Sequence, residues 1–129
     1  PARLVERDAH ANFFPHGLGH LVGLGVRDAS GYLPGRERSD RFGLAALRMD
    51  LPLAERYVTT VEPGLYFIEP LLTQPERRER FGDCTDWDEV ERWLRIGGVR
   101  IEDDVLVTDA EPVNLTADID KSFDAMIVA

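Results

Sequence analysis

The clearest pattern along the chain is a run of β-branched and aromatic residues at 57–68. Such residues favour strands, and Pro63-Gly64 divides the run, so the pattern predicts two strands that meet at this dipeptide. Residues 98–108 alternate between apolar and polar side chains, which predicts a further pair of strands with a turn near Asp103-Asp104. A short last strand is expected at 113–116.

Two charged segments have helical character. Residues 3–10 look like the end of a helix, and residues 74–95 are expected to be helical. Asp86 is a candidate N-cap, and Glu89, three residues later, would complete a pair resembling a capping box. The predicted apolar stripe of this helix consists of Val90, Trp93 and Leu94.

Glycine and irregular sequence dominate the first half of the chain. Four glycines lie within residues 13–27, and each costs about 1 kcal/mol in a helix interior relative to alanine. They suit a strand or a loop that packs closely against another backbone. Residues 28–56 are rich in Asp, Gly, Pro and Arg and are expected to be mostly loop, and such a long irregular stretch is usually functional or mobile.

Composition narrows the class of protein. The chain has 129 residues, enough for one domain, and its net charge of −9 disfavours binding to nucleic acid. No apolar run approaches the roughly 20 residues that span a membrane, and the polar N-terminal residues do not resemble a signal peptide. The chain begins at Pro1, within what looks like the tail of a helix, which predicts that it is a piece of a longer protein.

The chain contains one cysteine, Cys84, which excludes an internal disulfide and fits a reducing cytoplasm. Its neighbours in the sequence are polar and include no histidine, which favours an unreactive thiol. We therefore expect a cytoplasmic protein.

Three separate segments, residues 15–20, 60–64 and 97–104, combine a metal-capable side chain with residues that constrain the backbone. They supply His20, Glu62 and Glu102, which are 42 and 40 residues apart. Ligands so distant in sequence can meet only if the fold brings their strands together.

Each of these side chains also has a structural interpretation. Glu62 ends an apolar strand, so its carboxylate must be paired, coordinated or protonated, because desolvating a lone charge is costly. His20 follows glycines that let its backbone approach another segment, and alone it would be read as structural. Glu102 is expected to share a strand face with Arg100, and alone this pair would be read as a surface ion pair.

Together, the three side chains suggest a metal site rich in carboxylate and poor in imidazole. Such ligands favour Mn²⁺, Co²⁺ or Fe²⁺ over a structural zinc site built from cysteine. Two ions of this kind can share a hydroxide nucleophile and polarise a carbonyl group.

In their order and spacing, the three segments resemble the C-terminal part of the pita-bread metallopeptidases, and most of all the Xaa-Pro dipeptidases (prolidases). The resemblance extends from about Phe13 to Thr116. It implies an α+β fold of the creatinase/aminopeptidase type, with a curved antiparallel sheet and helices on its outer face. Residues 1–129 would form only the C-terminal portion of the catalytic domain.

The resemblance also implies a metal-ligand set. His20, Glu62 and Glu102 match family ligands, and Glu102 matches the carboxylate that bridges two divalent ions. These would be manganese, with cobalt, iron or zinc as alternatives. Glu62 further matches the proton shuttle of a reaction in which a metal-bridging hydroxide attacks the peptide carbonyl, and it would pass a proton to the leaving imino nitrogen.

The substrate-binding residues implied by the resemblance are mostly cationic. His16 matches a catalytic histidine that contacts the substrate or stabilises the tetrahedral intermediate. Arg48 matches an arginine for the dipeptide carboxylate, and Arg100 matches a second arginine near that pocket. Guanidinium groups suit this task because they bind a carboxylate through two hydrogen bonds. Arg27 stands where the family carries a histidine. Arginine is no acid or base near neutral pH but could bind an oxyanion or a carboxylate, so substrate preference and rate stay open.

The resemblance also leaves the site incomplete. Two aspartate ligands of the family lie upstream of the imidazole segment, and no matching stretch precedes His20. We therefore expect the chain alone to be inactive and its partner to be the upstream portion of the same protein. The family resemblance further suggests a homodimer that acts on a small peptide.

The leading hypothesis is a two-metal Xaa-Pro dipeptidase. One alternative is a hydrolase with the same fold and another substrate, such as aminopeptidase P, a creatinase-like amidinohydrolase or an organophosphate-cleaving relative. Another is a non-catalytic binding member, although such proteins usually lose metal ligands.

Overall fold

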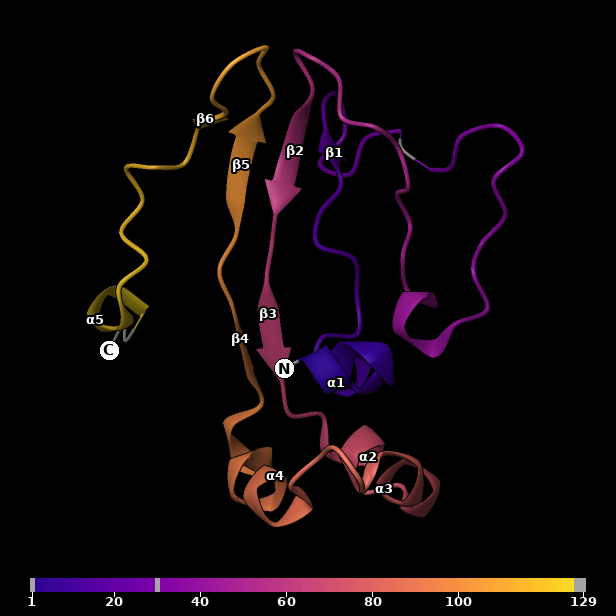
Figure 1. Ribbon diagram of the computed structural model, residues 1–129. Coiled ribbons are helices and arrows are strands. Elements are labelled where there is room, and N and C mark those ends of the chain that lie inside the picture. Colours follow the sequence, from indigo (N-terminus) through magenta and orange to yellow (C-terminus); the bar gives the residue numbers. More distant parts are fainter. Residues whose placement is uncertain (1, 30, 127–129) are drawn as a thin grey trace. The chain divides into compact units, whose positions relative to one another are not determined.

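The structure, a computed structural model, describes residues 2–29 and 31–126. Its contacts divide the chain into two compact units, each assembled from three stretches of sequence. Unit 1 comprises residues 1–17, 37–47 and 64–100, and unit 2 comprises residues 18–36, 48–63 and 101–129. Figure 1 traces the chain through its elements.

Unit 1 contains most of the helices and a two-stranded antiparallel sheet. The sheet pairs β3 (Gly64–Tyr66) with β4 (Gly98–Arg100). The helices are α1 (Ala2–Glu6), α2 (Glu69–Leu72), α3 (Pro75–Phe81), α4 (Trp87–Trp93) and the short 3-10 helices η1 (Ala9–Asn12), η2 (Phe42–Leu44) and η3 (Leu94–Ile96). Within the described part of the chain, no helix is long and apolar enough to cross a membrane.

The core of unit 1 is small and partly aromatic. Leu72 and Phe81 are fully buried, and the Phe42 ring lies 5.8 Å from that of Phe81. The buried amide of Asn12 is satisfied, because its Oδ1 accepts from Arg77 at 2.9 Å and its Nδ2 donates to a backbone carbonyl at 3.0 Å. Burying an amide without such partners would be costly, so this network supports the helical packing.

Helix α4 begins where the sequence predicts. The Glu89 N–H donates to Asp86 Oδ1 at 3.0 Å, which confirms the N-cap. The Glu89 carboxylate instead accepts from Arg92 and Trp93 in the next turn of the helix. Of the predicted apolar stripe, Val90 is buried whereas Trp93 is 44% exposed.

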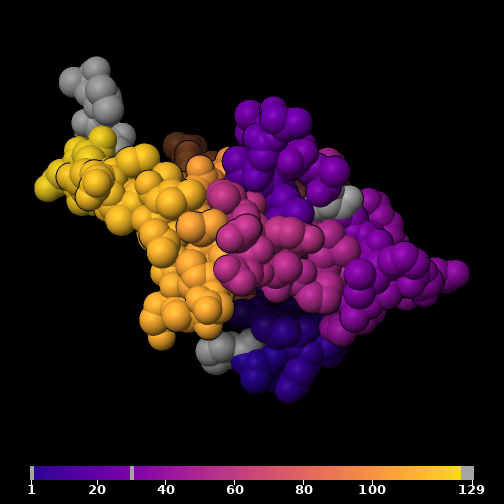
Figure 2. All heavy atoms as spheres, turned by 90° about the horizontal axis from the view of Figure 1, so that it is seen from above, coloured from indigo at the N-terminus to yellow at the C-terminus, as the bar shows by residue number. Residues whose placement is uncertain are grey.

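Unit 2 is built on a four-stranded antiparallel sheet in the order β1-β2-β5-β6. Its elements are β1 (Leu21–Val22), β2 (Val58–Val61), β5 (Asp103–Leu106), β6 (Val113–Asn114) and the helix α5 (Phe123–Met126). Figure 2 shows the end of this sheet where the chain leaving β5 lies against the chain entering β2, and Arg56 N–H donates there to the Val107 carbonyl at 2.9 Å. Of the strands predicted at 57–62 and 113–116, the structure forms 58–61 and the shorter stretch 113–114.

The turn expected near Asp103-Asp104 is wrong. Both residues belong to β5, where they lie opposite Val61 and Thr60. The interruption comes earlier, at 101–102, between β4 and β5. It lies opposite Pro63, whose carbonyl accepts from Ile101 N–H at 3.2 Å. Pro63 has no N–H to donate to a strand ladder, so the ladder is interrupted here, between β2 and β3 and between β4 and β5.

The helical region expected at 74–95 is two helices, with a break at residues 82–86. Pro75 starts α3 with a φ angle suited to the first turn, and Gly82 follows its last residue. Helix α2, which has a proline as its second residue, was not predicted because its four residues are too few to show a helical period.

Candidate metal centre

Three strand ends of unit 2 bring together the residues that the sequence singles out. His20 immediately precedes β1, Glu62 immediately follows β2, and Glu102 immediately precedes β5. One ligand atom from each side chain lies within 4.8 Å of the others, and among residues 2–29 and 31–126 they form the one such group of three. The antiparallel pairing of β1 and β5 with β2 is what places these ends side by side.

The ring of His20 is oriented to bind a metal ion. Its Nδ1 lies 3.0 Å from the Leu21 carbonyl oxygen, which can only accept, so Nδ1 carries the proton. The lone pair of a neutral ring is then on Nε2, which lies 3.5 Å from Glu62 Oε1. A backbone carbonyl that fixes the tautomer in this way is typical of metal-binding histidines.

Glu62 is held from both its backbone and its side chain. Its backbone N–H donates to the Leu18 carbonyl at 2.8 Å, and its Oε1 accepts from the Thr60 hydroxyl at 3.0 Å. The residue is 4% exposed. A carboxylate this deeply buried requires compensation by hydrogen bonds and a cation.

Gly19 allows the His20 segment to lie directly on β2. A Cβ atom built at Gly19 would lie 1.9 Å from the Thr60 carbonyl oxygen and 2.9 Å from its carbonyl carbon. These are backbone atoms of a paired strand and cannot move aside. Glycine is therefore required here by the close approach of two backbones.

The donor set fits a divalent cation. One imidazole nitrogen and two carboxylates converge, which suits manganese, iron, cobalt or zinc. Three protein ligands do not fill the coordination sphere of such an ion, so further ligands would be needed to complete it. The predicted metal-ligand trio is thus brought together in space.

His16 occupies a different setting, in unit 1. Its Nδ1 lies 2.8 Å from the Gly17 carbonyl oxygen and its Nε2 lies 2.9 Å from the Tyr66 hydroxyl. The carbonyl requires the proton on Nδ1, so Nε2 of the neutral ring accepts from Tyr66. Sequence reasoning missed Tyr66, because its contact with His16 joins residues 50 positions apart and no local pattern marks it.

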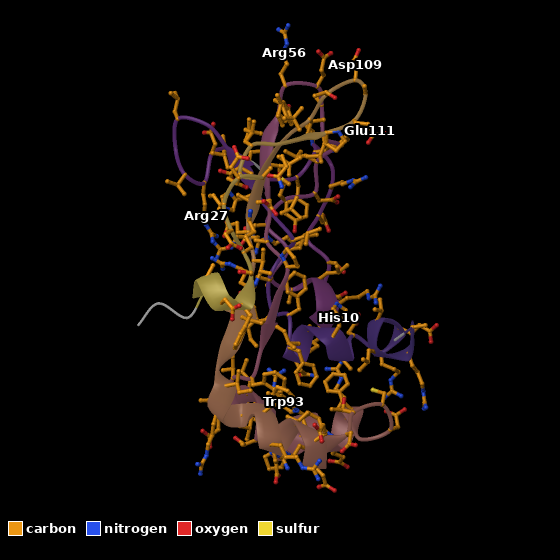
Figure 3. All side chains as sticks on the ribbon, turned by 90° about the vertical axis from the view of Figure 1, so that its left-hand side faces the viewer. His10, Arg27, Arg56, Trp93, Asp109 and Glu111 are labelled. Atoms are coloured by element: carbon orange, nitrogen blue, oxygen red, sulfur yellow. The ribbon has the colours of Figure 1, made fainter. Side chains whose placement is uncertain are left out.

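The three predicted arginines lie on exposed positions. Arg27, labelled in Figure 3, and Arg48 belong to loops of unit 2. Arg100 is in β4 of unit 1, opposite Gly64. Arg100 ends β4 and Glu102 lies between β4 and β5, so the two residues do not belong to one continuous strand, and a shared face stays a prediction.

Asp103, next to Glu102 in the chain, anchors the C-terminal segment to the sheet. Its carboxylate accepts from Lys121 at 2.9 Å, from Thr116 at 2.7 Å and from Asn114 at 2.9 Å. Lys121 first, and then the Thr116 and Asn114 donors, lower the pKa of Asp103 from 3.8 to about 2. The ionised form is the one that holds β6 and the residues after it in place.

We predict a pH-dependent stability from this carboxylate. A depressed pKa in the folded state stabilises the protein above pH 4, and this contribution is lost as the pH falls from about 4 to about 2. The Asp103→Asn variant should melt at a lower temperature than the unmodified protein between pH 5 and 7. The difference in melting temperature should shrink below pH 4, and a difference that is constant down to pH 2 would contradict the assignment.

Most of the chain matches a known protein family. The model of metallopeptidase family M24 matches residues 2–109. The chain is 44% identical to the Xaa-Pro dipeptidase of Stenotrophomonas maltophilia over 119 residues, and 43% identical to that of Homo sapiens over 107 residues. These alignments cover 90% and 83% of the chain, but only 27% and 22% of the two relatives. The chain thus spans about a quarter of their length.

Solved structures show a similar relationship. A single-residue variant of Escherichia coli aminopeptidase P matches 94% of the chain with 35% identity and a TM-score of 0.56. Zn-substituted E. coli aminopeptidase P in complex with product matches the same share with 34% identity and a TM-score of 0.55. In both cases 21% of the solved chain is covered.

Proposed function

Since this chain belongs to metallopeptidase family M24, we propose that it forms the C-terminal part of a two-metal Xaa-Pro dipeptidase. Its antiparallel sheets and helices belong to the pita-bread fold of the family, as the sequence predicted. The observation that carries the proposal is the convergence of His20, Glu62 and Glu102 within 4.8 Å. A family member that had lost catalysis would not need these three ligands in register.

The residues have complementary roles in this proposal. His20, Glu62 and Glu102 hold divalent ions, with manganese as our first choice. Bound ions would polarise the peptide carbonyl and lower the pKa of a water molecule. Glu62, buried and oriented by Thr60, takes a proton from the attacking water and delivers it to the leaving imino nitrogen.

We propose substrate-binding roles for four further residues. His16 would contact the substrate, with its ring held by Tyr66. Arg48 and Arg100 would bind the carboxylate of the dipeptide. Arg27 would contribute a fixed positive charge at the position where the family carries a histidine. This charge would favour a substrate with an anionic group there.

The proposed two-metal site requires ligands in addition to His20, Glu62 and Glu102. Two further carboxylate ligands would come from the upstream portion of the same protein. We further infer a cytoplasmic homodimer, supported by the family resemblance and by the single cysteine. Light scattering on the complete protein measures the subunit number, and a monomeric active enzyme would contradict the dimer.

The test is an assay of the complete protein with a Leu-Pro dipeptide. We expect hydrolysis, about two bound ions per site by elemental analysis, and loss of activity after removal of the metal. Manganese should restore the activity of the stripped protein. Full activity without metal would contradict the proposal.

Aminopeptidase P activity is a second candidate, because solved aminopeptidase P structures match 94% of the chain. The two functions differ in whether the substrate continues beyond the proline residue. A tripeptide Leu-Pro-Xaa cleaved faster than Leu-Pro would favour aminopeptidase P. The higher identity to the two dipeptidases, 43–44%, leads us to expect the dipeptide to be preferred.

A further inference from the structure

We propose that Thr60 is a positioning residue that couples the two ligands His20 and Glu62, an inference that rests on the proposed metal site. The Thr60 hydroxyl lies between them, 2.9 Å from the backbone nitrogen of His20 and 3.0 Å from Glu62 Oε1. One side chain thus contacts the backbone of one ligand and the carboxylate of the other.

The direction of each hydrogen bond follows from the donor inventory. A threonine hydroxyl has one proton and two lone pairs. The His20 N–H can only donate, so it occupies a lone pair of the hydroxyl. The single proton then goes to Glu62 Oε1 at 3.0 Å rather than to the His20 carbonyl at 3.5 Å, because the bond to a carboxylate is both shorter and charge-assisted.

The position of Thr60 is strongly constrained. It lies within β2 and pairs with Asp104 of β5, and it is 3% exposed. Gly19 covers its backbone so closely that a Cβ atom there would lie 3.2 Å from Thr60 Oγ1. A water molecule has little room to replace a lost hydroxyl, so its removal leaves both the His20 N–H and Glu62 without this partner.

The strand geometry explains why a residue at this position can act on Glu62. Side chains two residues apart project from the same side of an extended chain. Thr60 and Glu62 therefore lie on one side, and the hydroxyl restricts the rotamers of the longer carboxylate. Groups that orient a metal ligand in this way typically contribute 10–100-fold to metal affinity.

The neighbouring Thr59 provides a matched control. It belongs to the same strand and is 5% exposed, and its hydroxyl lies 3.2 Å from the backbone carbonyl oxygens of His20 and Thr60, which are both acceptors for its one proton. Thr59→Val removes the same group from the adjacent buried position of the strand without removing a bond to Glu62. The two valine variants should therefore lose similar stability but differ in metal affinity.

The test is calorimetric titration of Mn²⁺ into the metal-stripped complete protein, with thermal melting of each variant. Thr60→Val should weaken Mn²⁺ binding about 10–100-fold. Thr59→Val should change it less than twofold, and Thr60→Ser, which keeps the hydroxyl, should restore it. If Thr60→Val does not fold, Thr60→Cys offers a similar volume with a weaker donor and should bind more weakly than Thr60→Ser.

The outcomes separate the two proposals. If the unmodified protein binds Mn²⁺ tightly but Thr60→Val or Thr60→Cys binds as tightly as Thr59→Val, the coupling role is overturned. A Thr60→Ser variant as weak as Thr60→Val would also overturn it, because the hydroxyl would then not be the operative group. If the unmodified protein itself binds no divalent ion, the proposed metal site fails instead.

Discussion

Glu62→Gln should lower kcat/KM for Leu-Pro hydrolysis by about 10²–10⁴-fold, the range of a lost general acid–base group. Glutamine keeps the size of the side chain and an oxygen that can accept from Thr60, so the packing around this 4% exposed position is retained. What it loses is the negative charge and the capacity to carry a proton. Steady-state kinetics on the complete protein, with Mn²⁺ in excess, measures the effect.

A matched control distinguishes this effect from a general loss of charge. Glu111 is exposed in the connection between β5 and β6 and is labelled in Figure 3. Glu111→Gln changes the net charge by the same amount and should leave kcat/KM within twofold. A Glu62→Gln enzyme with near-normal activity at saturating metal would contradict the assignment of Glu62 as ligand and proton carrier.

Gly19→Ala should abolish high-affinity metal binding and reduce the stability of unit 2. The added methyl group would lie 1.9 Å from the carbonyl oxygen of Thr60, so the segment bearing His20 must move away from β2. Overpacking of this kind typically costs about 1–3 kcal/mol, and it would also break the bond from His20 N–H to the Thr60 hydroxyl. Calorimetric titration with Mn²⁺ and thermal melting measure the two consequences.

Gly17 is the natural control, since it lies two residues earlier in the same glycine-rich segment. A Cβ atom there would lie 3.4 Å from Leu47 Cδ1, the mobile end of a side chain, which is an ordinary contact. Gly17→Ala should therefore bind Mn²⁺ within about twofold of the unmodified protein. Equal loss in both variants would show that glycine flexibility, rather than the close approach at Gly19, is what the segment requires.

The strand positions were predictable because their causes are local. β-branched residues mark β2, Pro63-Gly64 separates it from β3, and Asp86 caps α4 through a bond to a residue three positions away. The errors arose where distant partners decide the outcome. Asp103 and Asp104 look like turn residues, but pairing with β2 holds them in a strand.

The residues of the candidate site also differ in whether the sequence reveals them. Residue type and neighbouring glycine and proline marked the three candidate ligands, whereas no local pattern marked Thr60 or Tyr66. Both act through side-chain contacts whose geometry depends on the packing of separate segments, Thr60 on His20 and Tyr66 on His16. The carboxylate of Asp103 likewise gains its low pKa from Lys121, 18 residues further along the chain.

By itself, the sequence determined which side chains could bind a metal and where most strands and helices form, because these depend on chemistry and on neighbours within a few residues. The tertiary structure alone decided that His20, Glu62 and Glu102 converge. Their meeting depends on the register of β2 with β1 and β5, and thus on hydrogen bonds between residues about forty positions apart. No local pattern specifies such a register, since it is selected by the combined packing and pairing of the whole sheet.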